Sequence, residues 1–244
     1  SVENCLNTAI LFTNNSTIGD NPDCEKKANF EWDFGDGTTI ENYNTPSAEN
    51  QTHTYTAPGN YTVSLSDTSK CGVDIYTKEI CVEPEITPSF TLDNNDGCIP
   101  FAVKATNTTD ENGLCSPPSY EWTIAYDSEN CGTSSDWSFT NGTSKTSENP
   151  SFLFENPGKY TISRKSTTAC GITTSQEIVN VKKPPTIAID AIQNLCGTAG
   201  SISPIASIEN CTANTTGITY NWTFVGGIPA TATTLIPGEI KYEK

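Results

Sequence analysis

Residues 30–37 read FEWDFGDG, in which large aromatic side chains alternate with acidic ones before a glycine-flanked aspartate. Successive side chains of a β-strand point to opposite faces, so Phe30, Trp32 and Phe34 would share one face. That face predicts a strand packed on a hydrophobic core. The GDG predicts a turn, because glycine adopts positive φ without steric cost and Asp36 can accept a hydrogen bond from backbone two residues later.

The two aspartates of this stretch, Asp33 and Asp36, could instead form a catalytic pair or a metal loop. A general acid and base must converge on one pocket, but we expect Asp33 on the solvent face and Asp36 in the turn, with no histidine beside them. A calcium loop needs oxygen ligands at alternating positions, and Phe34 and Gly35 break that pattern. Turn structure is the prediction, and weak cation binding by Asp33 and Asp36 is the remaining alternative.

The composition narrows the class of protein. The 244 residues carry 13 Lys and Arg against 29 Asp and Glu, a net charge of −16 that argues against a nucleic-acid partner. No apolar run reaches the roughly 18 residues of a membrane span. There are ten cysteines and one histidine, and the closest cysteines, Cys71 and Cys81, are ten residues apart, which favours disulfides over zinc. We therefore expect an exported protein and, with no methionine anywhere, a mature or excised piece of something longer.

A repeat organises the chain. Tryptophans 90 and 100 residues apart, at Trp32, Trp122 and Trp222, each follow a pair of cysteines. HTYTAPGNYTV (53–63) also matches FLFENPGKYTI (152–162). This predicts units at 1–85, 86–185 and 186–244, the third truncated because residues 236–244 align with the strand before the Pro-Gly turn. The Pro-rich joints at 82–88 and 181–186 predict stiff spacers.

Within the units, segments such as YTVSLSD and YTISRKS alternate with period two and are bounded by Gly, Pro and Asn. This pattern predicts an all-β fold of tandem sandwiches in an elongated array. His53, the single histidine, aligns with Phe152 and Ile240, so we expect a half-buried strand position. No nucleophile and base pair emerges, and the sequence therefore predicts no catalytic residue, no cofactor and no enzymatic activity.

The stretch from Trp32 to residue 66 resembles the PKD domain, an immunoglobulin-like sandwich with a WDFGDG strand-turn and a Y-x-x-x-G-x-Y-x-V segment. The second unit keeps Trp122 but reads WTIAYD, and the third keeps Trp222 but reads WTFVGG. The cysteines and the Asn/Thr richness are similar to those of the giant PKD-repeat adhesins of gliding Bacteroidetes, of the SprB type. That resemblance implies type IX export and adhesion during gliding.

Sandwich topology suggests a pairing for the cysteines. In an immunoglobulin-like sandwich, the loop entering the tryptophan strand and the loop after the tyrosine strand share one end, and the remaining cysteines lie at the other. The expected pairs within units are Cys24–Cys71, Cys115–Cys170, Cys5–Cys81 and Cys98–Cys131. For Cys196 and Cys211 we expect partners beyond residue 244, although a direct bond between them stays open.

Three aromatic residues outside the opening motif are also singled out. Tyr61 and Tyr160 follow Pro-Gly turns and resemble a tyrosine corner, in which the hydroxyl bonds back to local backbone. Trp137, in the insertion of the second unit, is the candidate for contact with a ligand.

Two functions of different classes follow. The first is a non-enzymatic segment of a cell-surface filamentous adhesin, with surface ligands or polysaccharide, neighbouring repeats and the outer-membrane secretion and motility machinery as partners. The second is a spacer or carbohydrate-binding module of a secreted hydrolase, which would present an exposed aromatic platform.

Overall fold

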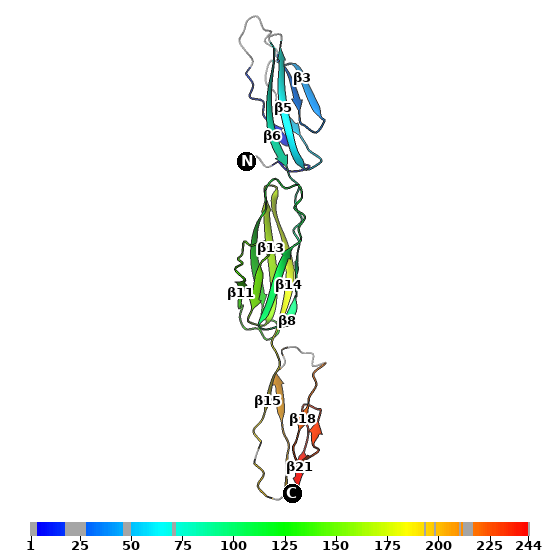
Figure 1. Ribbon diagram of the computed structural model, residues 1–244, viewed down its shortest axis with the longest axis vertical. Coiled ribbons are helices and arrows are strands. Elements are labelled where there is room, and N and C mark those ends of the chain that lie inside the picture. The colour runs from blue at the N-terminus through cyan, green and yellow to red at the C-terminus, as the bar shows by residue number, and fades with distance from the viewer. Residues whose placement is uncertain are drawn as a thin grey trace.

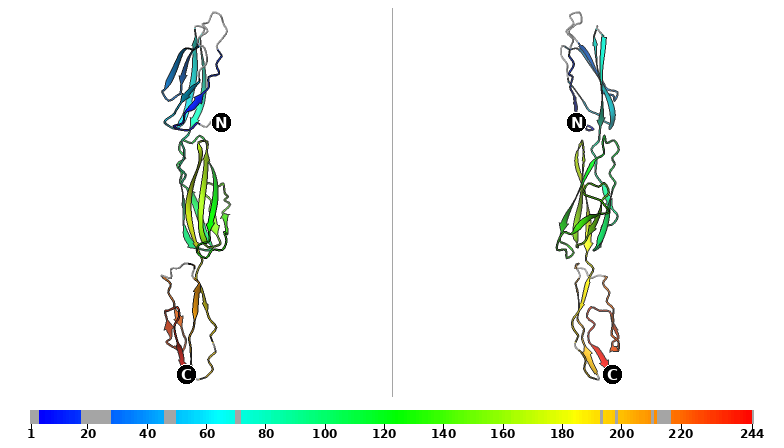
Figure 2. Two further views of the ribbon diagram at one scale, coloured as in Figure 1. Left: turned by 180° about the vertical axis from the view of Figure 1, so that it is seen from behind. Right: turned by 60° about the vertical axis from the view of Figure 1, so that its left-hand side comes forward.

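The computed structural model arranges the chain as three strand-rich units along one long axis (Figure 1). It describes residues 4–17, 28–45, 50–69, 72–192, 194–197, 199–209, 211 and 217–243. All regular structure in these ranges is β-strand, so the all-β prediction is confirmed. No helix in them could cross a membrane. Figure 2 shows the same single row of units from two further sides.

The first unit is a sandwich of a four-stranded and a two-stranded sheet. The larger sheet has the order β3-β2-β5-β6, and the smaller pairs β1 with β4. The strands are β1 (Ile10–Phe12), β2 (Ala28–Asp33), β3 (Thr39–Thr45), β4 (Gln51–His53), β5 (Gly59–Ser69) and β6 (Gly72–Val82). The alternation of the opening motif places Phe30, Trp32 and Phe34 inside, with 2%, 5% and 0% of their surfaces exposed.

The turn after β2 needs its first glycine. Gly35 has φ of 77°, and a Cβ there would lie 2.6 Å from the carbonyl oxygen of Thr62 on β5. The backbone N–H of Gly35 also donates to Asp33 Oδ1 at 2.8 Å. The first glycine of GDG is therefore required by a close approach of the turn to the neighbouring strand.

The second unit is a complete sandwich of two four-stranded sheets, in the orders β10-β13-β14-β8 and β11-β12-β9-β7. Its neighbours are antiparallel except β8, which runs parallel to β14. The strands are β7 (Phe90–Leu92), β8 (Asp96–Cys98), β9 (Phe101–Asn107), β10 (Ser119–Asp127), β11 (Trp137–Thr140), β12 (Ser151–Phe154), β13 (Gly158–Thr168) and β14 (Gly171–Lys182). Both sheets contribute to one core around Trp122.

The third unit has shorter strands and smaller sheets in the described residues. Its ladders join β15 to β17, β16 to β21, β21 to β19, and β18 to β20. The strands are β15 (Thr186–Ile189), β16 (Ala199–Ile202), β17 (Ala206–Glu209), β18 (Trp222–Thr223), β19 (Gly227–Ile228), β20 (Thr231–Ala232) and β21 (Ile240–Glu243). Few of its side chains are buried, among them Phe224 and Ile240.

Candidate functional site: the joints between the units

The aspartates of the opening motif are held in the turn. Asp36 Oδ1 accepts hydrogen bonds from the backbone N–H and the hydroxyl of Thr38, at 3.0 and 2.6 Å. Asp36 Oδ2 lies 2.7 Å from His53 Nε2 on β4. The expectation that no histidine lies beside these aspartates is therefore wrong. The first unit folds β4 back over the turn, and a 17-residue separation conceals that contact in the sequence.

The contact between Asp36 and His53 is not arranged as a catalytic relay. Thr38 Oγ1 lies 3.4 Å from the same Nε2 atom that meets Asp36, whereas a relay uses one ring nitrogen for the nucleophile and the other for the carboxylate. The imidazole also stacks on Phe34, with ring centroids 4.2 Å apart and planes 8° from parallel. His53 thus packs on the core edge as a half-buried strand residue, and its role here is structural.

The environment of Asp36 lowers the pKa of its carboxyl group. Burial acts in the opposite direction, to raise the pKa, but the hydrogen bonds from Thr38 and the proximity of His53 together outweigh it. Asp33 and Asp36 belong to no cluster of three or more metal-ligating side chains within the described ranges. Weak cation binding by this pair stays a prediction that the geometry does not favour.

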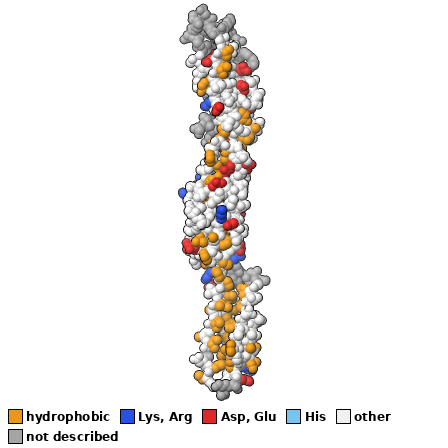
Figure 3. Space-filling model, viewed as in Figure 1, with side chains coloured by type: hydrophobic (Ala, Val, Ile, Leu, Met, Phe, Trp, Pro, Cys, Tyr) orange, Lys and Arg blue, Asp and Glu red, His pale blue; other side chains and the backbone are white. Residues whose placement is uncertain are grey.

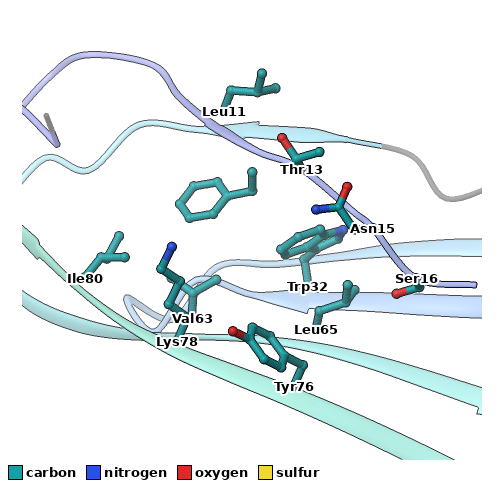
Figure 4. Close-up of a pocket in the computed structure, with 11 residues that line it drawn as sticks. Leu11, Thr13, Asn15, Ser16, Trp32, Val63, Leu65, Tyr76, Lys78 and Ile80 are labelled. Carbon is teal, nitrogen blue, oxygen red and sulfur yellow. The ribbon is translucent and has the colours of Figure 1, made fainter. Parts of the chain in front are cut away.

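A hollow of about 550 Å³ opens beside Trp32 in the first unit (Figure 4). It is lined by apolar side chains with a polar rim that includes Asn15 and Lys78. Trp32 Nε1 is buried and has no acceptor among the described residues. By contrast, Trp122 donates to the carbonyl of Ser147 at 2.7 Å. Trp32 therefore lines this hollow while its indole donor, unlike that of Trp122, is unsatisfied.

The cysteines join consecutive units. Cys5 is bonded to Cys170 and Cys81 to Cys115, with Cα atoms 5.5 and 5.8 Å apart, so two disulfides cross the joint between the first and second units. A third disulfide, Cys131–Cys211, crosses the next joint with a Cα distance of 5.2 Å.

The predicted pairs Cys5–Cys81, Cys115–Cys170 and Cys98–Cys131 are therefore wrong, and Cys24–Cys71 lies outside the described residues. The expectation that Cys211 bonds to Cys196 or beyond residue 244 is also wrong, because its partner is Cys131. The topological argument assigned these cysteines to the two ends of each sandwich and then assumed that cysteines at one end of a unit bond to each other. Short joints bring the end of one unit against the start of the next, so cysteines of facing ends reach bonding distance. Cys98 and Cys196 are free and exposed.

A buried carboxylate completes the first joint. Glu83 follows β6 and is only 2% exposed. Its Oε2 accepts the backbone N–H of Cys115 at 3.0 Å, and its Oε1 accepts that of Cys170 at 3.2 Å. One residue of the first unit therefore bonds to both half-cystines that the second unit contributes. The sequence analysis missed Glu83, and its only signal was an acidic residue inside an otherwise Pro-rich joint.

Backbone hydrogen bonds hold Glu83 within the first unit, and one packing contact crosses the same joint. The N–H of Leu6 donates to the carbonyl of Glu83, and the N–H of Glu83 to the carbonyl of Asn4, at 2.9 and 3.1 Å. Gly113 of the second unit lies against Pro58 of the first, where an added Cβ would approach the proline ring to 3.2 Å. The second joint has an exposed ion pair between Lys183 and Glu209 at 3.5 Å in addition to its disulfide.

The remaining singled-out aromatic residues have structural positions. The hydroxyls of Tyr61 and Tyr160 donate to carbonyls four residues upstream, at 2.7 and 2.8 Å, in the geometry of a tyrosine corner. Trp222 donates to the carbonyl of Thr234 at 2.9 Å. Trp137 lies on β11 and packs on the core of the second unit. It is half-buried there, and its contact with a ligand stays a prediction.

A second structural cluster was absent from the sequence analysis. Arg164 on β13 is fully buried, donates to Asn107 and Thr109, and lies 5.8 Å from the ring centre of Trp122. Burial lowers the pKa of its guanidinium. In the first unit Leu65 faces Trp32 across the same pair of strands, so the second unit has replaced an apolar contact with a cation.

Comparisons with known proteins agree with this architecture. The family model of the PKD domain matches residues 7–84, which span the first unit. A solved three-domain immunoglobulin fragment of the titin I-band is similar over 100% of this chain and 85% of its own, with TM-score 0.54 and 12% identity. The E-to-A mutated variant of that fragment is similar over 99% of this chain and 84% of its own, with TM-score 0.51 and 12% identity. No curated protein matches in sequence.

These similarities establish the class of fold. The chain is a tandem array of immunoglobulin-like β-sandwiches, as predicted, and its first unit matches a PKD domain. Modules of this kind are common in extracellular proteins, and the three interdomain disulfides fit an oxidising environment.

Proposed function

We propose that the chain is a non-enzymatic segment of an exported, rod-like cell-surface protein whose joints are built to resist bending and extension. The observation that carries this proposal is the first joint, where two disulfides and the buried Glu83 connect the same two units. Two covalent links at separate points prevent the pivoting that a single linker permits. Interdomain motion is the default for tandem domains, so this degree of cross-linking requires a reason.

The route of tension through the chain supplies that reason. The Cys5–Cys170 bond closes a loop over a sequence separation of 165 residues. A force applied along the array passes from Cys5 directly to Cys170 and bypasses the first unit and most of the second. Roughly 550 Å of fully extended chain, at about 3.3 Å per residue, is thereby withheld from extension. The first unit stays folded under load because the load does not reach it, whereas in the second unit the load passes through β14, which follows Cys170.

At a finer level, we propose that this rod belongs to a surface adhesin of the type used in gliding motility, exported by a type IX system. The support is the combination of a PKD domain match in the first of three repeated units, abundant cysteines and a net charge of −16. Its partners would be neighbouring repeats and a surface ligand or polysaccharide. The rest of the gene product, with further repeats and a type IX sorting domain, is the observation that would decide this level.

Single-molecule pulling tests the mechanical proposal. With handles at both termini, the oxidised chain should unfold with a total extension several hundred ångströms shorter than the reduced chain. Replacement of Cys5 and Cys170 by serine should release a smaller part of that length, because Cys81–Cys115 and Cys131–Cys211 remain. Equal extension before and after reduction would contradict the proposal.

One observation favours the second candidate, a carbohydrate-binding module. The hollow beside Trp32 combines aromatic walls with a polar rim, and Tyr76 at its edge is 70% exposed. Aromatic surfaces of this kind stack on sugar rings. Retention of the chain on insoluble polysaccharide, lost in Tyr76→Ala but kept in Tyr220→Ala, would support this candidate. Equal retention of both variants would remove the hollow as its site.

A further inference from the structure

The third unit exposes apolar side chains that a sandwich normally buries. Figure 3 shows hydrophobic side chains gathered in a stripe along the unit nearest the C-terminus. Four apolar residues, Ile192, Leu195, Ile202 and Ile205, line one hollow of about 370 Å³ there. The third unit's large hydrophobic residues that are at least 46% exposed are Ile187, Ile189, Ile192, Leu195, Ile205, Val225, Ile228 and Ile236.

The strand register shows that some of these positions are core positions of the fold. In the second unit, Val103 pairs with Phe152, and Asn107, four residues later, pairs with Phe90. In the third unit, Ile202 pairs with Ile240, and the residue four later pairs with Ile189.

Ile189 therefore occupies the position of Phe90, yet Phe90 is 4% exposed and Ile189 is 54% exposed. Trp222, which corresponds to the fully buried Trp122, is likewise only half-buried.

The element that covers these positions in the second unit is the hairpin of β13 and β14. Tyr160, Ile162, Val179 and Val181 of this hairpin are 0% exposed and belong to the same core as Phe90. The first unit has the corresponding hairpin in β5 and β6. Strand β10 forms a nine-residue ladder with β13, whereas β18, which carries Trp222, pairs only with the two residues of β20. The described residues of the third unit include no counterpart of this hairpin, so the sheet that the hairpin would extend is incomplete.

An independent observation lies at the facing end of the second unit, in Cys98. Cys98 pairs in parallel with Lys182, and Ile99 donates to the carbonyl of Lys182 at 2.9 Å. Cys5 stands in the same relation to Glu83, through a parallel bridge and the bond from the next residue at 2.9 Å. Cys5 and Cys98 are thus equivalent positions in consecutive units.

The disulfide partner of Cys5 indicates which kind of partner would suit Cys98. Cys5 is bonded to Cys170, which lies in the tight turn between β13 and β14 of the following unit. Cys98 is free and exposed at the joint toward the third unit. A hairpin that completed the third unit in the manner of β13 and β14 would carry its turn to this same end. The uncovered apolar face and the unpaired cysteine would therefore both be satisfied by one element, a hairpin like that of β13 and β14.

We propose that the apolar face of the third unit is the acceptor site for a β-hairpin with alternating apolar residues and a cysteine in its turn, and that this cysteine forms a disulfide with Cys98. The hairpin would enter after β21, as β13 follows β12 in the second unit. To form the bond, the two thiols give two electrons and two protons to a small-molecule disulfide, which becomes two thiols. This inference does not depend on the mechanical role proposed above.

The test appends residues 157–182, the hairpin of the second unit, directly after Lys244 of the full chain. This position keeps the spacing that separates β12 from β13. Refolding in a glutathione redox buffer should give a disulfide between Cys98 and the appended copy of Cys170, found by non-reducing peptide mapping. Binding of a hydrophobic dye should fall at least twofold relative to the parent chain.

A matched control carries serine at the appended copies of Ile162, Val179 and Val181, so that length and cysteine are kept while the apolar face is lost. This control should keep the dye binding of the parent. Cys98→Ser in the fusion with the unaltered hairpin should lose the disulfide and retain the lowered dye binding. This variant separates the effect of covering the apolar face from the effect of the disulfide.

Several outcomes would overturn the proposal. The first is full alkylation of Cys98 in the fusion together with dye binding equal to that of the control. Bonding of the appended cysteine to Cys196 instead would contradict the register. If sedimentation showed that the parent chain dimerises, and its dye binding fell only at the high concentrations where the dimer forms, the occupant of the apolar face would be a second copy of the chain. As a check that does not require the fusion to fold, the peptide 157–182 added to the parent should form a mixed disulfide with Cys98 and not with Cys196.

Discussion

Asp36 is a single side chain whose role was decided by its partners and not by its residue type. Its two oxygens accept hydrogen bonds from Thr38 and meet His53, which leaves the carboxylate occupied with the turn. These contacts lower the pKa of the carboxyl group in the folded state below its ordinary value of 3.8. The ionised form of Asp36 therefore stabilises the first unit.

The first prediction concerns the pH dependence of that contribution. Because the folded-state pKa is depressed, the stabilisation is present above the ordinary pKa and is lost as the pH falls through the folded value. Asp36→Asn should lower the free energy of unfolding by about 1 kcal/mol at pH 5. The difference from the parent should shrink toward pH 2.5 in urea titrations. A difference that stayed constant over this range would show that the charge is not involved.

Arg164 supports a second prediction at this scale. Arg164→Leu copies the residue that the first unit has at this position but removes the guanidinium that donates to Asn107 and Thr109, whose oxygens keep the backbone N–H groups of Thr109 and Ser89 as donors. At about 1.5–3 kcal/mol for a hydrogen bond to a charged group, we expect a loss of roughly 3 kcal/mol in the unfolding of the second unit. The half-buried neighbour Lys165, which makes only a long ion pair with Glu121, provides the control, since Lys165→Ala should change stability by less than about 0.5 kcal/mol. Similar losses in both variants would contradict the role of burial.

The turn between β2 and β3 carries a prediction at the scale of an element. Gly35 and Gly37 both have positive φ, at 77° and 91°, but only Gly35 faces a neighbouring strand. Gly37→Ala should cost about 1 kcal/mol from backbone strain alone. Gly35→Ala should cost clearly more, because its Cβ would approach the Thr62 carbonyl to 2.6 Å. Thermal unfolding of the two variants measures the difference, and equal midpoints would show that the turn can shift away from β5.

The hairpins are the elements that carry the architecture. Those of the first and second units each form a ladder of 11 residue pairs, and the turn of β13 and β14 reaches the preceding unit through Cys170. The same element therefore completes its own sandwich and fastens the joint before it. This double role explains why the third unit, where the described residues include no such hairpin, has both an exposed apolar face and a free cysteine opposite it.

At the scale of the whole molecule, the two disulfides of the first joint predict its stiffness. Removal of either bond leaves one tether and the Glu83 contacts, so the distribution of overall lengths in solution should broaden only slightly. Replacement of Cys5, Cys81, Cys115 and Cys170 together by serine should broaden it strongly. Small-angle X-ray scattering with ensemble fitting measures this distribution. Equal broadening in the double and fourfold variants would show that one bond alone sets the stiffness.

The sequence by itself determined the local structure and the repeat. The alternation around Trp32 and the GDG turn depend on residues close in sequence, and each was placed correctly. Only the tertiary structure decided which cysteines meet and that His53 reaches Asp36. A disulfide between residues 165 apart depends on which ends of two domains face each other, and strand periodicity carries no information about that. The cysteines were assigned to ends by fold topology, but their partners were fixed by the short joints between the units.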